Sequence, residues 1–116
     1  DGEAEQAVAG FTACVEEAID AMVQLAQQET PDVAKALKGI KWHSETMLTC
    51  YPAESRARYF RHTDNSSGNG RILTAICYLN KGWTEADGGK LRLFHGGEKN
   101  LRVKTEVEPL WNRLIL

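Results

Sequence analysis

The first quarter of the chain carries apolar residues at intervals of three and four, which is the period of an α-helix. Between Glu3 and about Gln28 these positions form one stripe, with Glu and Gln on the opposite face. The stripe consists of Ala4, Ala7, Val8, Phe11, Val15, Ile19, Met22 and Leu25 or Ala26. The pattern predicts an amphipathic helix whose stripe is a packing surface, because nothing polar and reactive lies on it.

A second, shorter helix is predicted to end at Lys38. Thr30-Pro31 offers a cap followed by a proline at the first helical position, and Gly39 offers a left-handed stop. We expect the helical part, residues 3–38, to brace a sheet.

After Gly39 the helical period disappears, and β-branched, aromatic and alternating residues take over. A strand is predicted from Ile40 to Tyr51, ending at Pro52, with Met47, Thr49 and Tyr51 on one face. The further predicted strands are about Tyr59 to Asp64, Arg71 to Leu79, Lys90 to Phe94, Leu101 to Val107 and Arg113 to Leu116. Residues 40–116 are therefore predicted to form a β core.

Two of these strands carry more specific patterns. Ile72 to Leu79 is apolar on both faces and is expected to lie at the centre of a sheet. In the segment from Leu101 to Glu108, apolar residues and Thr105 alternate with charged residues, which predicts one face on a core and the other in water. With the two helices, the strands predict an α+β fold built on an antiparallel sandwich or barrel.

Composition narrows the classes of partner. The chain has 116 residues, the length of one domain or part of one, and neither a repeat nor a linker divides it. Its 14 basic and 16 acidic residues, without basic tracts, argue against capture by nucleic acid or an anionic membrane. The longest apolar run, Ile72 to Leu79, is broken by Thr74 and is far shorter than the roughly 20 residues of a membrane span.

Cysteine usage points to a reducing compartment. Cys14, Cys50 and Cys77 are odd in number and widely spaced, so neither a disulfide framework nor a zinc knuckle is indicated. Cytoplasm or nucleus is the expected location.

The candidate chemistry lies in His62-Thr63-Asp64. A strand places residues two apart on one face, so the imidazole and the carboxylate are expected to point the same way. Two histidines and one carboxylate on one face of the metal, with three coordination positions open, are the ligands of non-haem Fe(II) oxygenases. The alternative is a solvated or mutually hydrogen-bonded pair near a loop.

The segment Asp64 to Gly70, which follows this pair, resembles a calcium loop only superficially. The glycine needed at the sixth position is Asn69, and the acidic twelfth residue is Ala75. The segment is better explained as a flexible turn, rich in residues that tolerate positive φ.

A family resemblance runs from about Met47 to the last residue. The blocks that carry it are Met47-Leu48-Thr49-Cys50-Tyr51-Pro52, Tyr59-Phe60-Arg61-His62-Thr63-Asp64-Asn65, Gly70-Arg71-Ile72-Leu73-Thr74-Ala75-Ile76-Cys77-Tyr78-Leu79-Asn80-Lys81-Gly82-Trp83, Gly88-Gly89-Lys90-Leu91-Arg92-Leu93-Phe94 and Glu108-Pro109-Leu110-Trp111-Asn112-Arg113-Leu114. In this order they resemble the Fe(II)- and 2-oxoglutarate-dependent prolyl hydroxylases, and most closely those of hypoxia-inducible factors. The resemblance implies a double-stranded β-helix, or jelly-roll, core.

The resemblance also implies roles for single residues. His62 and Asp64 take the places of the iron ligands, and Tyr51 that of the tyrosine that hydrogen-bonds the 2-oxoglutarate carboxylate. Tyr78 takes a place close to the same pocket, whose slot Met47 and Leu91 would line. Arg71 takes a place near the peptide entrance, where it would touch substrate; the alternative is a solvated arginine beside a turn.

The chain also departs from the family pattern. In the family, the second iron-binding histidine and the arginine that binds the co-substrate come later in the sequence than the position of Leu116. Neither His43 nor His95 occupies the position of that second histidine. These two histidines are expected at the surface. The expectation is an incomplete catalytic domain, with the jelly roll unfinished at its C-terminal end and little or no activity of the chain alone.

Two hypotheses follow. The first is a dioxygenase that uses Fe(II), 2-oxoglutarate, ascorbate and dioxygen to hydroxylate a prolyl residue of a protein or peptide. The second is a non-catalytic double-stranded β-helix module that serves binding or dimerisation.

Overall fold

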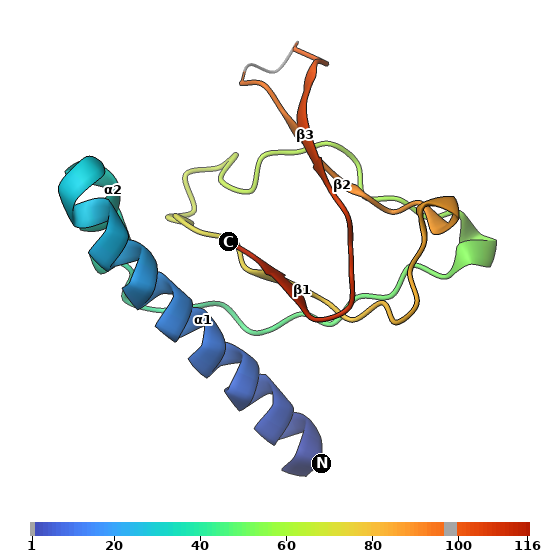
Figure 1. Cartoon of the computed structure of the whole chain (residues 1–116), viewed down its shortest axis with the longest axis horizontal. Coiled ribbons are helices and arrows are strands. Elements are labelled where there is room, and N and C mark those ends of the chain that lie inside the picture. The colour runs from blue at the N-terminus through green and yellow to red at the C-terminus, as the bar shows by residue number, and fades with distance from the viewer. Residues whose placement is uncertain (1, 97–99) are drawn as a thin grey trace. The chain divides into compact units, whose positions relative to one another are not determined.

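The computed structural model describes residues 2–96 and 100–116, and these fall into two compact units. The first unit comprises the residues up to Thr49 together with His62–Thr74, and the second comprises Cys50–Arg61 and Ala75–Leu116. Figure 1 traces the chain through both of them. A single domain over residues 1–116 stays a prediction.

Both predicted helices form in the first unit. Helix α1 spans Gly2–Glu29 and helix α2 spans Pro31–Lys38, with Pro31 in the first turn as predicted. The prediction that Gly39 ends the helix in a left-handed conformation is wrong, because Gly39 has φ −78° and is right-handed. The Gly39 N–H donates to the carbonyls of Lys35 and Ala36, so the last turn tightens and needs no left-handed residue.

The two helices pack against each other in a hairpin. The buried side chains are Val23 of α1 and Ala34 and Leu37 of α2, exposed by 7%, 3% and 7%. On α1 the predicted stripe is half-buried at Phe11, Val15, Ile19, Met22 and Ala26. Ala26 and not Leu25 continues the stripe, since Leu25 is 77% exposed.

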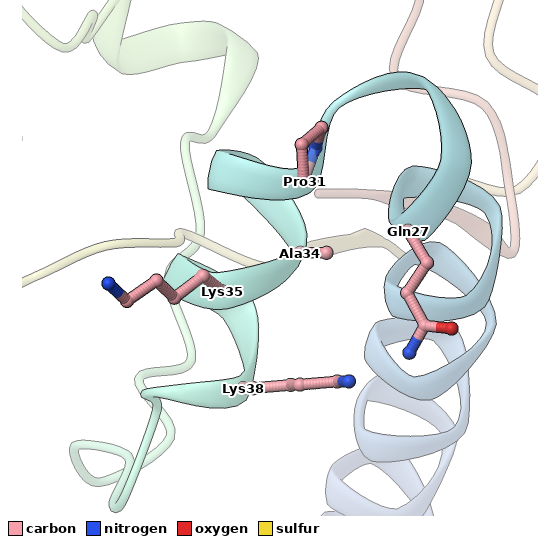
Figure 2. A pocket seen from close by; sticks show the side chains of 5 residues that line it. All are labelled: Gln27, Pro31, Ala34, Lys35 and Lys38. Carbon is pink, nitrogen blue, oxygen red and sulfur yellow. The ribbon is translucent and has the colours of Figure 1, made fainter.

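An open cavity of about 300 Å³ lies where the hairpin turns. It is lined by Gln27, Pro31, Ala34, Lys35 and Lys38. Lys38 extends toward α1, whereas Lys35 points away from it (Figure 2). The cavity results from two helices that diverge from a short connection, and its lysine side chains do not converge on one point.

The second unit contains two separate antiparallel strand pairs. Strand β1 (Ile76–Tyr78) pairs with β4 (Arg113–Ile115), and β2 (Leu91–Phe94) pairs with β3 (Val103–Val107). Short 3₁₀ turns at Ala53–Ser55 and Glu85–Asp87 interrupt the connections. The last four predicted strands therefore each contain a strand of the structure, in shortened form.

The predicted strands at 40–51 and 59–64 do not form, and of the segment 71–79 only Ile76–Tyr78 is a strand. The reason is that strand propensity becomes structure only where a second backbone supplies hydrogen bonds. Among the described residues these segments have no ladder partner, and the apolar side chains of Leu48 and Phe60 are 85% and 74% exposed.

Two more expectations are corrected. Within residues 2–96 and 100–116, the run from Ile72 to Leu79 is not a central strand, because β1 has β4 as its one neighbour. On β3 all side chains except Val107 are exposed, so the predicted core face is not covered. The antiparallel β character is confirmed, and the jelly roll is not, because the described residues form two two-stranded sheets, whereas a jelly roll has two sheets with eight strands in all.

Substitution of Leu37 tests the helix hairpin. We expect Leu37→Ala to lower the free energy of unfolding by about 2 kcal/mol, near the low end for a leucine at a packed position. The matched control Leu25→Ala removes an exposed leucine from α1 and is expected to change stability by less than about 0.5 kcal/mol. Urea denaturation followed by far-UV circular dichroism measures both, and equal losses would contradict the described packing.

Candidate functional site

His62 and Asp64 lie side by side although no strand forms around them. The imidazole Nε2 of His62 is 2.9 Å from Oδ1 of Asp64. The two side chains are 49% and 36% exposed, so both are accessible from solvent. The residues leading up to Thr63 have no regular secondary structure, and a turn begins at Asp64.

The spacing of these two atoms suits a shared metal ion. Bonds from first-row divalent metals to nitrogen and oxygen are about 2.1 Å, so two donors at adjacent octahedral corners lie about 3 Å apart. The 2.9 Å between Nε2 and Oδ1 has this value, and it is equally the length of the hydrogen bond that joins the imidazole to the carboxylate in the structure. The donor set, one imidazole and one carboxylate, also suits Fe(II).

The other oxygen of Asp64 faces away from His62 toward two further groups. The Thr74 hydroxyl donates a hydrogen bond to Oδ2, and Nη1 of Arg71 lies 3.9 Å from the same oxygen. The Thr74 hydrogen bond, helped by the charges of His62 and Arg71, holds the pKa of Asp64 below its usual value, against a smaller opposing effect of burial. The carboxylate is thus kept ionised, as a metal ligand must be.

Two asparagine side chains close the loop between Asp64 and Arg71. The Asn65 amide donates to the carbonyl of Arg71, and the Asn69 amide donates to the carbonyl of Asp64. The Asn69 side-chain oxygen accepts from the Arg71 N–H. We call these three bonds the asparagine clasp.

Glycine makes this closed loop possible. Gly68 and Gly70 have φ of +66° and +79°, as the predicted turn requires. The clasp and these two glycines bring residues 71–74 back to the carboxylate.

The remaining predicted site residues are distributed over both units. Met47 is in the first unit and 75% exposed, whereas Tyr51, Tyr78 and Leu91 are in the second. Tyr51 is exposed, and Tyr78 on β1 and Leu91 on β2 are half-buried. Burial raises the pKa of the Tyr78 phenol and keeps it protonated. A common slot formed by these residues stays a prediction.

No third donor joins His62 and Asp64 within the described residues. Among them, no three side chains of His, Cys, Asp or Glu gather closely enough to hold a metal ion. His43 is exposed, with Nδ1 2.8 Å from the Ser44 carbonyl oxygen, and His95 is half-buried. The helices described here are too short or too polar to cross a membrane.

Sequence reasoning missed the part played by Thr74. The signal was present, because Thr74 is the hydroxyl that interrupts the apolar run from Ile72 to Leu79. The sequence did not show that Asp64 is the partner of this hydroxyl. A hydrogen bond between residues ten apart depends on the path of the loop between them and not on their spacing in the sequence.

Comparison with known proteins identifies a family and several relatives of the chain. The family model of the 2OG-Fe(II) oxygenase superfamily matches residues 46–116. The chain is 42% identical over 77 residues to "Prolyl hydroxylase EGLN3" of Rattus norvegicus, which is 66% of this chain and 30% of that protein. It is 39% identical over 77 residues to "Egl nine homolog 1" of Homo sapiens, again 66% of this chain and 17% of that protein.

A third relative is "Hypoxia-inducible factor prolyl hydroxylase" of Caenorhabditis elegans, 37% identical over 73 residues, which is 62% of this chain and 10% of that protein. The chain therefore spans less than a third of the length of these relatives. No solved structure matches it.

Removal of the Thr74 hydroxyl tests the electrostatics of the carboxylate. We expect Thr74→Val to raise the pKa of Asp64, since the hydrogen bond from the hydroxyl favours the ionised form. Because the pKa of Asp64 is lower in the folded than in the unfolded protein, the ionised carboxylate stabilises the fold at every pH above the unfolded-state pKa. This stabilisation is lost as the pH falls through the folded-state pKa. Carboxyl ¹³C NMR titration of metal-free protein measures the shift, with Thr105→Val on exposed β3 as control. An unchanged or lower Asp64 pKa in Thr74→Val would contradict the described contact.

Proposed function

The chain belongs to the 2OG-Fe(II) oxygenase superfamily, and from this membership we propose that it carries the His-x-Asp part of the iron centre of a prolyl hydroxylase. The observation that supports the proposal most directly is the pair of donors, His62 Nε2 and Asp64 Oδ1, at 2.9 Å. Further support comes from two of the relatives, which are named as prolyl hydroxylases.

In this proposal His62 and Asp64 hold Fe(II), His62 as the neutral ring and Asp64 as the ionised carboxylate. When bound, the iron couples the oxidative decarboxylation of 2-oxoglutarate by dioxygen to the hydroxylation of a C–H bond. A third ligand comes from another part of the complete protein, since the described residues of this chain supply two.

The remaining residues bind and orient. The Tyr51 hydroxyl donates to a carboxylate of 2-oxoglutarate, and Tyr78, protonated because burial raises its pKa, stands near the same pocket. Met47 and Leu91 line the pocket with apolar side chains that exclude water. Sites for small ligands are usually lined in this way. Arg71 contacts the substrate, a protein or peptide with a target proline.

Other parts of the proposal concern the whole protein. Ascorbate keeps the iron reduced between turnovers, and the protein acts in the cytoplasm or the nucleus as a single dioxygenase domain with a jelly-roll core. The activity is proposed for the complete protein, because the chain spans 30% or less of the relatives' lengths.

Ligand substitutions test the iron site. The substitutions are made in the complete protein to which these residues belong. We expect His62→Ala and Asp64→Asn each to lower the rate of succinate formation from 2-oxoglutarate by at least about 100-fold. Iron content measured after dialysis is expected to fall in parallel. His43→Ala removes an exposed histidine and is the matched control, expected to retain wild-type activity and iron.

The outcome also separates the two hypotheses. Wild-type complete protein that binds no iron and forms no succinate with any prolyl peptide would contradict the oxygenase and favour the non-catalytic binding module. Normal activity in His62→Ala would place the iron site elsewhere.

Substitution of Tyr51 tests the co-substrate pocket. We expect Tyr51→Phe to raise the KM for 2-oxoglutarate about 10- to 100-fold with a smaller change in kcat, because a hydrogen bond to a charged group contributes about 1.5 to 3 kcal/mol. Tyr59→Phe removes a phenol hydroxyl from another exposed tyrosine and is expected to leave this KM unchanged. Steady-state assays over a range of 2-oxoglutarate concentrations decide the result, and equal KM values in all three proteins would remove Tyr51 from the pocket.

A further inference from the structure

Thr74 lies on the segment that returns to the site after the loop. It is half-buried, as are its neighbours Leu73 and Ala75, and its hydroxyl donates to Oδ2 of Asp64. It stands ten residues after Asp64, and the asparagine clasp closes the loop between them. The hydrogen bonds of the clasp and the hydrogen bond from the Thr74 hydroxyl to Asp64 therefore belong to one closed loop.

The two oxygens of Asp64 have separate partners. Oδ1 is 2.9 Å from His62 Nε2, and Oδ2 accepts the hydrogen bond from Thr74. A carboxylate binds a metal ion through one oxygen or through both. The Thr74 hydrogen bond uses one lone pair of Oδ2 and fixes the direction of the carboxylate, which leaves Oδ1 as the oxygen beside the imidazole.

The Arg71 guanidinium is a weaker candidate for holding Oδ2. Its Nη1 is 3.9 Å away, beyond the range of about 2.7 to 3.2 Å for a hydrogen bond, and its side chain is 44% exposed. Its attraction for the carboxylate is therefore screened by water and has little directional preference. The hydroxyl of Thr74 supplies the direction.

We propose that Thr74 is a positioning residue of the metal site: its hydroxyl holds Oδ2 so that Asp64 binds the metal through Oδ1 alone. This inference rests on the proposed function. Binding through both oxygens would occupy a further coordination position, and an oxygenase site needs its open positions for the organic co-substrate and dioxygen. Thr74 thereby keeps a position open without touching either ligand.

Three substitutions separate the hydroxyl from the shape of the side chain. Thr74→Val keeps the β-branched shape and loses the hydroxyl, Thr74→Ala loses both the hydroxyl and the methyl group, and Thr74→Ser keeps the hydroxyl. Thr105→Val, on exposed β3, is the control for a threonine outside the site. The complete protein is used, with Co(II) in place of iron as a spectroscopic probe.

We expect Thr74→Val and Thr74→Ala to bind one Co(II), as the wild type does, but with an altered visible absorption spectrum, because the carboxylate changes its binding mode. With Fe(II), their kcat/KM for 2-oxoglutarate is expected to fall about 10- to 100-fold, mainly through KM. Thr74→Ser and Thr105→Val are expected to match the wild type in both measurements. Far-UV circular dichroism establishes which variants are folded, and Thr74→Ala against Thr74→Ser decides the result should Thr74→Val fail to fold.

The proposal is overturned by a wild-type Co(II) spectrum and wild-type KM in Thr74→Val and Thr74→Ala, or by Thr74→Ser behaving like Thr74→Ala. Failure of the proposed function gives a different result. In that case the wild type binds Co(II) and the variants change its spectrum, but no 2-oxoglutarate is consumed. A wild-type protein that binds no Co(II) overturns both.

Discussion

The carboxylate of Asp64 is the group on which the candidate site depends. It faces His62 with one oxygen and Thr74 and Arg71 with the other, so three side chains determine its charge and its direction. Each contact alone is modest, because the carboxylate is about a third exposed and water screens the charges around it. A hydrogen bond on one side and an imidazole on the other nevertheless select one orientation, and that orientation presents two donors at the spacing of a shared metal.

The site is held by local polar contacts and not by a large core. In the described chain the buried apolar side chains are Val23, Ala34 and Leu37 in the helix hairpin and Pro109 in the second unit. The ligand loop instead relies on the asparagine clasp, whose bonds join residues two to six apart. Closing such a short loop costs little chain entropy. The loop also remains close to water, where opening is easier than in a packed core.

Much of the fold and part of the site followed from the sequence. Helical periodicity predicted both helices to within one or two residues, because an amphipathic helix satisfies its backbone hydrogen bonds internally and needs one packing surface. The strands at 91–94, 103–107 and 113–115 were also predicted, each flanked by turn residues. The strands at 40–51 and 59–64 were predicted from the same kind of signal and are absent. A strand depends on a partner that its own residues do not specify.

The same distinction applies to the chemistry. The sequence alone determined that an imidazole and a carboxylate stand two residues apart in a segment matching an oxygenase family, because residue identity and spacing are written in the chain. Only the tertiary structure decided that Oδ2 of Asp64 turns to Thr74 while Oδ1 turns to His62. That choice depends on where the chain goes after Gly70. Two side chains ten residues apart meet only when glycine torsions and the asparagine clasp bend the backbone between them.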